Sequence, residues 1–251
     1  MSTSPLLITG NSHVIALADA LSEGQATGRK PESINAKVFP LGNGRFEIDT
    51  FSRVESNGDT PGVRFTVETY AASLSHHAGR DRIAPVEGER WGFVLVNHNA
   101  RIYRQATWLT HEPASIMTAR KQPVTQGLVR RVAERDHRGV RTFFEHLQDA
   151  GVDFFAISAP PPRLDHPAVR RGVRREVIAH IDRTARQVWA EWLDDRGIAM
   201  VPPPENSTDA DGFLLPELAS RRIHMGKRDR HHANAEYGAR QLGQIAATFA
   251  T

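Results

Sequence analysis

The amino-acid sequence predicts an α/β protein: a three-layer α/β/α sandwich around a flavodoxin-like, five-stranded parallel sheet, with an inserted β-hairpin. Three observations predict this class. Five short segments are continuously apolar, several are followed by apolar residues at helical spacing, and glycines close two of the helices directly before the next apolar segment. Continuous apolar strands indicate a sheet that is covered by helices on both faces, as parallel sheets are. The sequence leaves the order of the strands open.

The predicted elements follow one another along the chain. The five apolar segments predict strands over 6–8, 34–39 (ending at Pro40), 92–96, 152–157 and 198–201. Apolar residues at a period of 3.6 predict helices that begin near Val14, that carry Phe143 and Leu147, and that span 173–192 and 235–249. Gly151 and Gly197 stand where helices end, as glycine commonly does.

Two segments depart from this alternation. Within residues 45–90, the runs 45–51 and 63–70 alternate between apolar and polar residues, and turn-forming residues lie between them, which predicts an inserted β-hairpin. Residues 202–228 begin with three prolines and remain irregular, which indicates a long functional loop or lid. We therefore expect one domain over residues 1–251.

Composition narrows the class of protein. Hydrophobic residues make up 39% of the 251 residues and charged residues 24%, which is enough apolar material for a core. The sequence shows no long apolar run and no basic, apolar leader, so we expect neither a transmembrane helix nor a secretory signal. The absence of cysteine excludes disulfides, thiolate metal sites and cysteine nucleophiles, and fits a cytoplasmic location.

The charge balance gives little indication of a macromolecular partner. There are 32 basic and 29 acidic residues, so the formal net charge is only +3. Basic clusters at 170–175 and 221–228 could contact nucleic acid, but a solvated helix face and a charged loop are the commoner roles of such runs. We expect no nucleic-acid partner and no membrane partner, and the oligomeric state stays open.

Polar residues follow several of the predicted strands. Ligands of parallel α/β sheets bind at the carboxyl ends of the strands. The residues at these ends are Ser12, Gly42 to Gly44, and Asn97 to Asn99. Ser12 stands between a buried strand and the first turn of a helix, where backbone N–H groups favour negative charge. Helix capping is the alternative role of Ser12.

An acid and a histidine stand three residues apart before the last helix. A carboxylate can orient an imidazole and stabilise its cationic form, and Asp229 and His232 are close enough in sequence to meet in one turn. Such a pair would supply the base that a serine nucleophile needs. His231 is an adjacent competitor that spacing alone does not reject.

These residues carry a family resemblance. Gly10-Asn11-Ser12-His13 resembles the Gly-Asp-Ser block of SGNH/GDSL hydrolases, and the segment from Asp229 to Gly238 resembles their closing Asp-x-x-His block. The resemblance implies the same sandwich fold and a triad of Ser12, Asp229 and His232, with His232 rather than His231 as the base. It also implies an ester hydrolase or acyltransferase that needs no cofactor and acts on a small acyl or acetyl ester, on a small molecule or a carbohydrate.

The resemblance also implies donors for an oxyanion hole. These are the backbone N–H of Ser12, a backbone N–H from Gly42 or Gly44, and an amide from Asn97 or Asn99. The sequence departs from the family at two places: Asn11 stands where aspartate is usual, and the Gly-x-Asn-Asp block has no clean copy.

The sequence also bears on three other possible functions. An α/β-hydrolase of the Gly-x-Ser-x-Gly kind is rejected because Val14 stands at the second glycine. A metal-dependent hydrolase would use some of the 12 histidines, but no His-Glu-x-x-His occurs and no metal ligands are assigned. A catalytically inactive domain that binds a glycan or a partner stays open.

Overall fold

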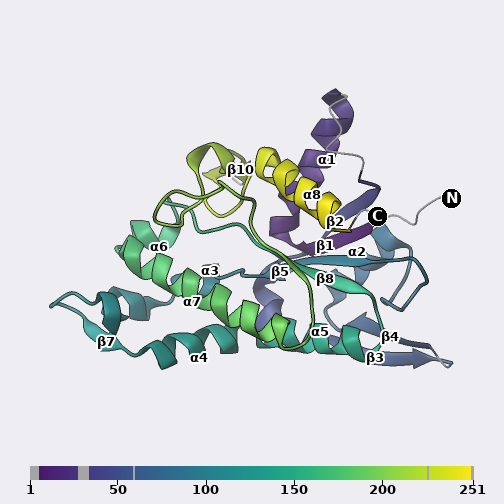
Figure 1. Ribbon diagram of the computed structural model, residues 1–251, viewed down its shortest axis with the longest axis horizontal. Coiled ribbons are helices and arrows are strands. Elements are labelled where there is room, and N and C mark those ends of the chain that lie inside the picture. Colours follow the sequence, from purple (N-terminus) through teal and green to yellow (C-terminus); the bar gives the residue numbers. More distant parts are fainter. Residues whose placement is uncertain (1–5, 28–33, 59, 225, 250–251) are drawn as a thin grey trace.

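The computed structural model describes residues 6–27, 34–58, 60–224 and 226–249. Its main sheet has five parallel strands in the order β2-β1-β5-β8-β9 (Figure 1). They are β1 (Leu6–Asn11), β2 (Ala36–Gly42), β5 (Trp91–Val96), β8 (Phe154–Ser158) and β9 (Met200–Val201). The predicted fold class is therefore confirmed. The strand order is that of flavodoxin-like sheets, which reverses beside β1, so the ends of β1 and β5 border the crevice where such folds bind ligands.

Helices cover both faces of this sheet, as the continuous apolar strands predict. One face packs against α1 (Ile15–Thr27) and α8 (Ala235–Phe249), and the other against α2 (Glu68–Ala78), α5 (Arg138–Asp149) and the end of α7 (Arg175–Asp194) (Figure 1). Neighbouring residues of one strand serve opposite faces: Ile8 joins the core under α1 and α8, whereas Leu7 joins the core under α2 and α5. Both faces of β1 are thus fixed just before Ser12.

The second strand runs further than the sequence predicts. Pro40, expected to end it, lies inside β2, where it stands opposite Gly10 of β1. Proline donates no hydrogen bond, and β2 tolerates it because it is the edge strand of the sheet. The ladder shifts register between Gly10 and Asn11, so that Asn11 pairs with Gly42. This irregularity places the end of β2 next to the start of the first helix.

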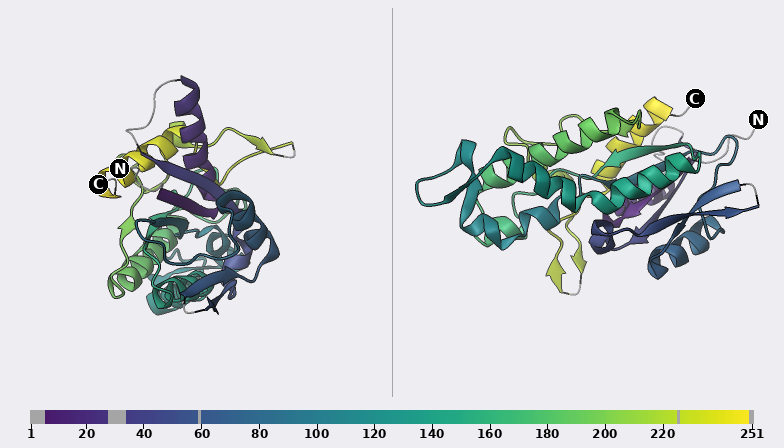
Figure 2. Two further views of the ribbon diagram at one scale, coloured as in Figure 1. Left: turned by 90° about the vertical axis from the view of Figure 1, so that its right-hand side faces the viewer. Right: turned by 90° about the horizontal axis from the view of Figure 1, so that it is seen from below.

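The predicted hairpin is present, but with different limits. It consists of β3 (Ser52–Asn57) and β4 (Thr60–Phe65), which pair antiparallel (Figure 2). The run 45–51 is instead largely a 3₁₀ helix, η2 (Gly44–Ile48), because the Asn43 side chain accepts a hydrogen bond from the Arg45 N–H and caps it. The end of the run 63–70 begins α2, which packs against β2.

Two further regions complete the molecule. Residues 100–136, which periodicity left unassigned, form a small layer against α7: α3 (Ala100–Tyr103), η3 (Ala106–Leu109), β6 (His111–Pro113), η4 (Ala114–Ile116), β7 (Gln122–Val124) and α4 (Gln126–Asp136). The helix α6 (Pro167–Arg170) precedes α7, and the largely irregular segment 202–228 holds η5 (Pro216–Leu218) and a hairpin of β10 (Ile223–His224) and β11 (Lys227–Arg228). Both views of Figure 2 show this hairpin projecting from the body. Within the described ranges, every helix falls short of the length or apolar character that a membrane span needs.

A close helix contact holds the end of the chain against its beginning. A Cβ on Gly238 of α8 would lie 1.9 Å from the carbonyl oxygen of Ala16 in α1, so only glycine allows this approach. The loop that leads into α8 is thereby held beside the turn that follows β1.

Candidate active site

Ser12 is not the residue that caps the first helix. It begins the 3₁₀ turn η1 (Ser12–Val14), and the preceding Asn11 is the cap: its Oδ1 accepts a hydrogen bond of 3.0 Å from the backbone N–H of His13. Asn11 is fully buried and Ser12 is half-buried. Because Asn11 takes the capping role, the Ser12 hydroxyl is free to contact another group.

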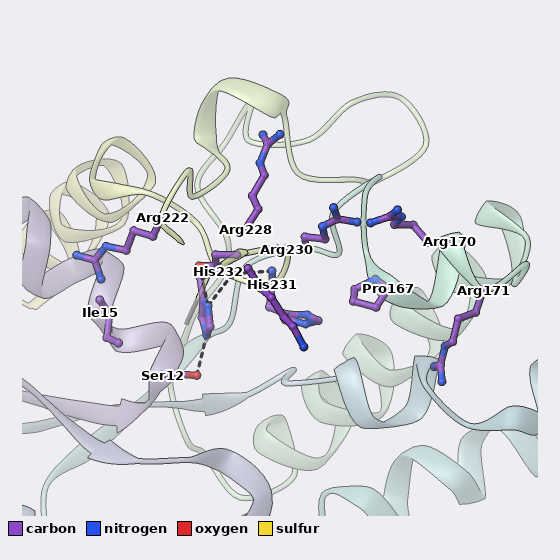
Figure 3. A pocket seen from close by; sticks show the side chains of 13 residues that line it. Ser12, Ile15, Pro167, Arg170, Arg171, Arg222, Arg228, Arg230, His231 and His232 are labelled. Atoms are coloured by element: carbon purple, nitrogen blue, oxygen red, sulfur yellow. Dashed lines mark hydrogen bonds and ion pairs between the residues drawn. The ribbon is translucent and has the colours of Figure 1, made fainter. Parts of the chain in front are cut away.

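That group is His232, 220 residues further along the chain. The Ser12 Oγ lies 2.8 Å from Nε2 of His232, and Nδ1 of His232 lies 3.0 Å from each carboxylate oxygen of Asp229 (Figure 3). A carboxylate accepts hydrogen bonds only, so the proton of a neutral His232 resides on Nδ1 and leaves Nε2 as the acceptor for the Ser12 hydroxyl. The structure thus brings these three predicted residues together in hydrogen-bonding order.

Asp229 is held as a carboxylate by its own turn. Its Oδ1 also accepts hydrogen bonds from the backbone N–H groups of His231 (2.9 Å) and His232 (3.2 Å). Burial acts to raise the pKa of Asp229, but the hydrogen bonds from the His232 side chain and the His231 backbone outweigh it and hold that pKa well below its ordinary value. Asp229 can therefore orient the imidazole without itself taking up a proton near neutral pH.

A buried arginine fixes the position of this turn. Nη1 of Arg163 donates to the carbonyl oxygens of Ser220 (2.9 Å) and His232 (3.2 Å), and its Nε lies 2.8 Å from Asp165. The backbone N–H of Ser220 also donates to the His232 carbonyl, at 3.0 Å. No sequence motif indicates Arg163, although it follows β8 and the three prolines, at the same edge of the sheet as the other candidates.

The competitor His231 points elsewhere. Nη2 of Arg104 lies 2.5 Å from Nε2 of His231 and 3.2 Å from its Nδ1. Burial, followed by the charge of Arg104, lowers the pKa of His231 to about 4. Its ring contacts neither Ser12 nor the Asp229 carboxylate, so the geometry favours His232 as the base.

Gly42 and Gly44 lie beside the nucleophile turn. Gly42 pairs with Asn11 at the end of the sheet, and Gly44 begins η2. The backbone between them is anchored: the Tyr70 hydroxyl donates to the carbonyl of Asn43 at 2.7 Å, and Arg101 donates to that of Gly44 at 2.5 Å.

Asn97 and Asn99 direct their amides away from Ser12. Nδ2 of Asn97, a residue with a left-handed backbone (φ 62°), donates to Ser158 Oγ at 3.0 Å. Nδ2 of Asn99 donates to Asp182 at 2.9 Å, while its Oδ1 lies 3.0 Å from Nε2 of His137. Both asparagines are buried in this separate polar network.

The residue between them, His98, lies on the side of the nucleophile. Its Nδ1 is 3.4 Å from Asn11 Nδ2 and 3.3 Å from Oε2 of the fully buried Glu47. A Cβ on Gly44 would lie 2.7 Å from the His98 ring, so a glycine is needed there for the ring to fit. The sequence resemblance pointed to the amides of Asn97 and Asn99 and not to His98, because an amide is the donor that the family block implies.

A third imidazole fills the space between His98 and His232. The ring of His13 lies 4.9 Å from each of these two rings, centroid to centroid. Burial, followed by the charges of His98 and His232, lowers the pKa of His13 well below its ordinary value. His13 is therefore a neutral, buried wall of the site.

Across the described ranges, no group of three or more His, Asp or Glu side chains is arranged to hold a metal ion. The residues that the structure gathers at the carboxyl edge of the sheet are instead a serine, an imidazole and a carboxylate in one chain of hydrogen bonds.

Comparisons with known proteins find likeness in fold only. No protein-family model and no curated protein matches the chain. A solved structure described as a proposed platelet activating factor from Streptococcus pneumonia is similar with a TM-score of 0.51 and 12% identity, over 99% of this chain and 85% of that one. A proposed acylhydrolase from Bacteroides fragilis has a TM-score of 0.49 and 8% identity, over 97% of this chain and 85% of that one.

A proposed lipolytic protein of the G-D-S-L family from Desulfitobacterium hafniense has a TM-score of 0.48 and 11% identity, over 98% of this chain and 99% of that one. The sandwich fold that the two end motifs imply is confirmed by the likeness at a TM-score of 0.51. At these identities the likeness says nothing of substrate.

Proposed function

We propose that the chain is a serine ester hydrolase with Ser12 as nucleophile, His232 as general base and Asp229 as the residue that orients His232. The observation that carries the proposal is the continuous set of hydrogen bonds from Ser12 Oγ through His232 to Asp229, at 2.8 and 3.0 Å. The similar structures are described as acyl-hydrolysing and lipolytic proteins, and the same reaction type is proposed here.

The proposed reaction proceeds through an acyl-enzyme. His232 Nε2 takes the Ser12 proton as Oγ attacks the ester carbonyl, and the imidazolium is stabilised by Asp229. The tetrahedral intermediate collapses, the C–O bond to the alcohol breaks, and His232 gives its proton to the departing oxygen. Water, deprotonated by His232, then releases the acyl group as an acid; a second alcohol in its place would give acyl transfer. The expected substrates are small acyl or acetyl esters, including esters on carbohydrate.

The oxyanion would be held by backbone N–H groups of Ser12 and of Gly42 or Gly44, with His98 as the third donor instead of Asn97 or Asn99. Oδ1 of Asn11 accepts from His13, so its Nδ2 is the end that faces His98 Nδ1. In the tautomer in which Nδ1 accepts from Asn11, Nε2 of His98 carries the ring proton and can donate it to the oxyanion.

His98→Ala is expected to lower kcat for a simple ester by about 100- to 1000-fold with a smaller change in KM, as loss of one oxyanion donor does. His98→Asn, which restores a side-chain N–H donor, is expected to recover part of this loss. The exposed His76 on α2 supplies a control, since His76→Ala should leave kcat as it is. Steady-state kinetics of the three variants with phenyl acetate make the measurement. An unchanged kcat in His98→Ala would remove His98 from the oxyanion site.

The proposal is tested directly by a fluorophosphonate, which reacts only with an activated serine. Incubation followed by intact-mass and peptide analysis is expected to show a single adduct, on Ser12. Ser22, whose hydroxyl bonds to the Ala18 carbonyl in α1, serves as an internal control and should stay unlabelled. A folded protein that gains no adduct, or gains it on another serine, would overturn the proposed triad.

A further inference from the structure

The pocket that contains Ser12 and His232 is strongly cationic. It has a volume of about 1190 Å³, and six basic side chains line it (Figure 3): Arg170, Arg171, Arg222, Lys227, Arg228 and Arg230. The single acidic side chain in its lining is Asp229, and both of its carboxylate oxygens are bonded to His232. Since the whole chain carries a formal net charge of only +3, positive charge is concentrated at this pocket.

Most of these basic groups have no carboxylate partner. Arg222 pairs with Asp19, and Nη2 of Arg171 donates to the Arg104 carbonyl at 3.0 Å. In the part of the chain that the structure describes, no carboxylate forms an ion pair with the other four, Arg170, Lys227, Arg228 and Arg230.

Several arginines outside the pocket do have a carboxylate partner. The ion pairs away from the pocket include Arg80 with Glu89 (2.7 Å), Arg90 with Asp153 (2.8 Å), Arg101 with Asp136 (3.0 Å), Arg174 with Glu112 (2.8 Å) and Arg186 with Asp182 (2.6 Å). These arginines are compensated by a carboxylate, whereas four of the six basic side chains of the pocket have none among the described residues.

Two of the unpaired arginines face each other across the pocket. Arg170 ends α6 on one wall, and Arg230 lies inside the Asp229–His232 turn on the other. Figure 3 shows their guanidinium groups pointing toward one another. Two such groups repel when nothing lies between them, whereas an oxyanion placed there would accept charge-assisted hydrogen bonds from both.

Burial and nearby positive charge both lower the pKa of two groups beside the pocket. Burial, followed by the charge of Arg171, lowers the pKa of Arg104. Burial, followed by the charges of His231 and Arg104, lowers the pKa of His166 to about 3. Burial is thus the main cause of both shifts, and the charges of Arg171 and Arg104 act in the same direction.

We propose that the substrate is an ester that also carries an oxyanion group (phosphate, sulfate or carboxylate), which binds between Arg170 and Arg230 while the ester carbonyl lies at Ser12. This inference rests on the proposed hydrolase function and names the substrate class of that same site. The turn that positions His232 supplies one of the two anion-binding arginines, so substrate binding and base positioning share one segment.

The test compares two esters that differ by one charge: phenyl acetate and its para-sulfonate derivative. The quantity measured is kcat/KM for the sulfonate ester divided by kcat/KM for phenyl acetate. Arg170→Gln and Arg230→Gln are each expected to lower this ratio about tenfold, as loss of one charge-assisted contact would. Arg170→Lys, which keeps the positive charge, should retain most of the wild-type ratio. The control is Arg131→Gln, an exposed arginine on α4 outside the pocket, which should keep the wild-type ratio.

Raising the salt concentration from about 0.05 M to about 0.5 M is also expected to lower the wild-type ratio, because exposed charges are screened. A ratio that is the same in wild type, Arg170→Gln and Arg230→Gln would overturn the inference while leaving the hydrolase function in place.

A binding measurement decides the inference even without turnover. Isothermal titration of the Ser12→Ala protein with para-hydroxybenzenesulfonate should give a Kd that rises about tenfold with Arg170→Gln or Arg230→Gln added. Phenol, which lacks the sulfonate, should bind more weakly than the sulfonate. Equal binding of the two compounds would reject the anion site. Failure of fluorophosphonate labelling, by contrast, would reject the triad alone.

The oxyanion could belong to a soluble ester or to a lipid headgroup, and vesicles distinguish these sources. A lipid headgroup would be assigned if the protein sediments with phosphatidylglycerol vesicles but not with phosphatidylcholine vesicles, and if Arg170→Gln abolishes this sedimentation. The sulfonate effect without vesicle binding would assign it to a soluble ester. The absence of both the vesicle binding and the sulfonate effect would overturn the proposal.

Discussion

Ser12→Ala and His232→Ala are each expected to lower kcat for ester hydrolysis by about 10⁶-fold, and the double variant should be no slower than either one alone. The reason is that the 2.8 Å contact between Ser12 Oγ and His232 Nε2 makes the two side chains one functional unit. Without the hydroxyl, the base has no proton to take, and without the base, the hydroxyl stays a weak nucleophile. Initial rates of phenyl acetate hydrolysis make the measurement.

The double variant separates this mechanism from independent roles. If Ser12 and His232 acted separately, their losses of free energy would add, and the double variant would fall far below both single variants. A residual rate in all three variants is expected from the oxyanion donors and from binding alone. Thermal unfolding of each variant checks that the fold is retained, and wild-type turnover in a folded Ser12→Ala protein would end the serine mechanism.

Asp229→Asn is expected to lower kcat by about 10⁴-fold, a smaller but still large loss. Asparagine can keep the turn, because its Oδ1 can accept the backbone hydrogen bonds from His231 and His232. It cannot stabilise the imidazolium of His232, and its amide can stabilise the wrong tautomer of the ring. Asp209→Asn is the matched control: Oδ1 of Asp209 likewise accepts from the backbone N–H groups of Asp211 and Phe213, away from the triad.

The same variant should change how stability depends on pH. The pKa of Asp229 is lower in the folded protein than in an unfolded chain, where it is about 4. Its charge therefore stabilises the fold above the unfolded pKa, and this contribution is lost as the pH falls toward the folded pKa. The difference in unfolding free energy between wild type and Asp229→Asn should be largest at neutral pH and shrink below about pH 4. A difference that is constant with pH, measured by urea unfolding, would contradict this linkage.

The elements that could be predicted from sequence are those that depend on local patterns. The five strands and the helices that follow them are encoded by apolar runs and by the 3.6-residue period, and Gly151 and Gly197 lie in the left-handed region where helices end. Periodicity was less informative where alternating apolar and polar residues fit both a strand and a short 3₁₀ helix. The alternating run 45–51 formed η2 because the cap at Asn43 is a side-chain contact that alternation does not register.

The candidate site shows the same division. Asp229 and His232 are three residues apart, so one turn brings them together and the sequence alone could pair them. Their contact with Ser12 spans 220 residues and depends on the packing of α8 on α1 through Gly238. Asn97 and Asn99 are hydrogen-bonded to Ser158 and Asp182, away from Ser12. The proposal of His98 as the oxyanion donor therefore depends on tertiary contacts.

The sequence by itself determined the layered α/β class, the helix and strand segments, and the two end motifs, because each depends on residues near one another in the chain. The tertiary structure decided the strand order, the capping role of Asn11 and the gathering of unpaired arginines around Ser12. Those features depend on which distant segments meet at the carboxyl edge of the sheet. A cluster such as Arg170 with Arg230 becomes visible only when α6 and the turn before α8 form the two walls of one pocket.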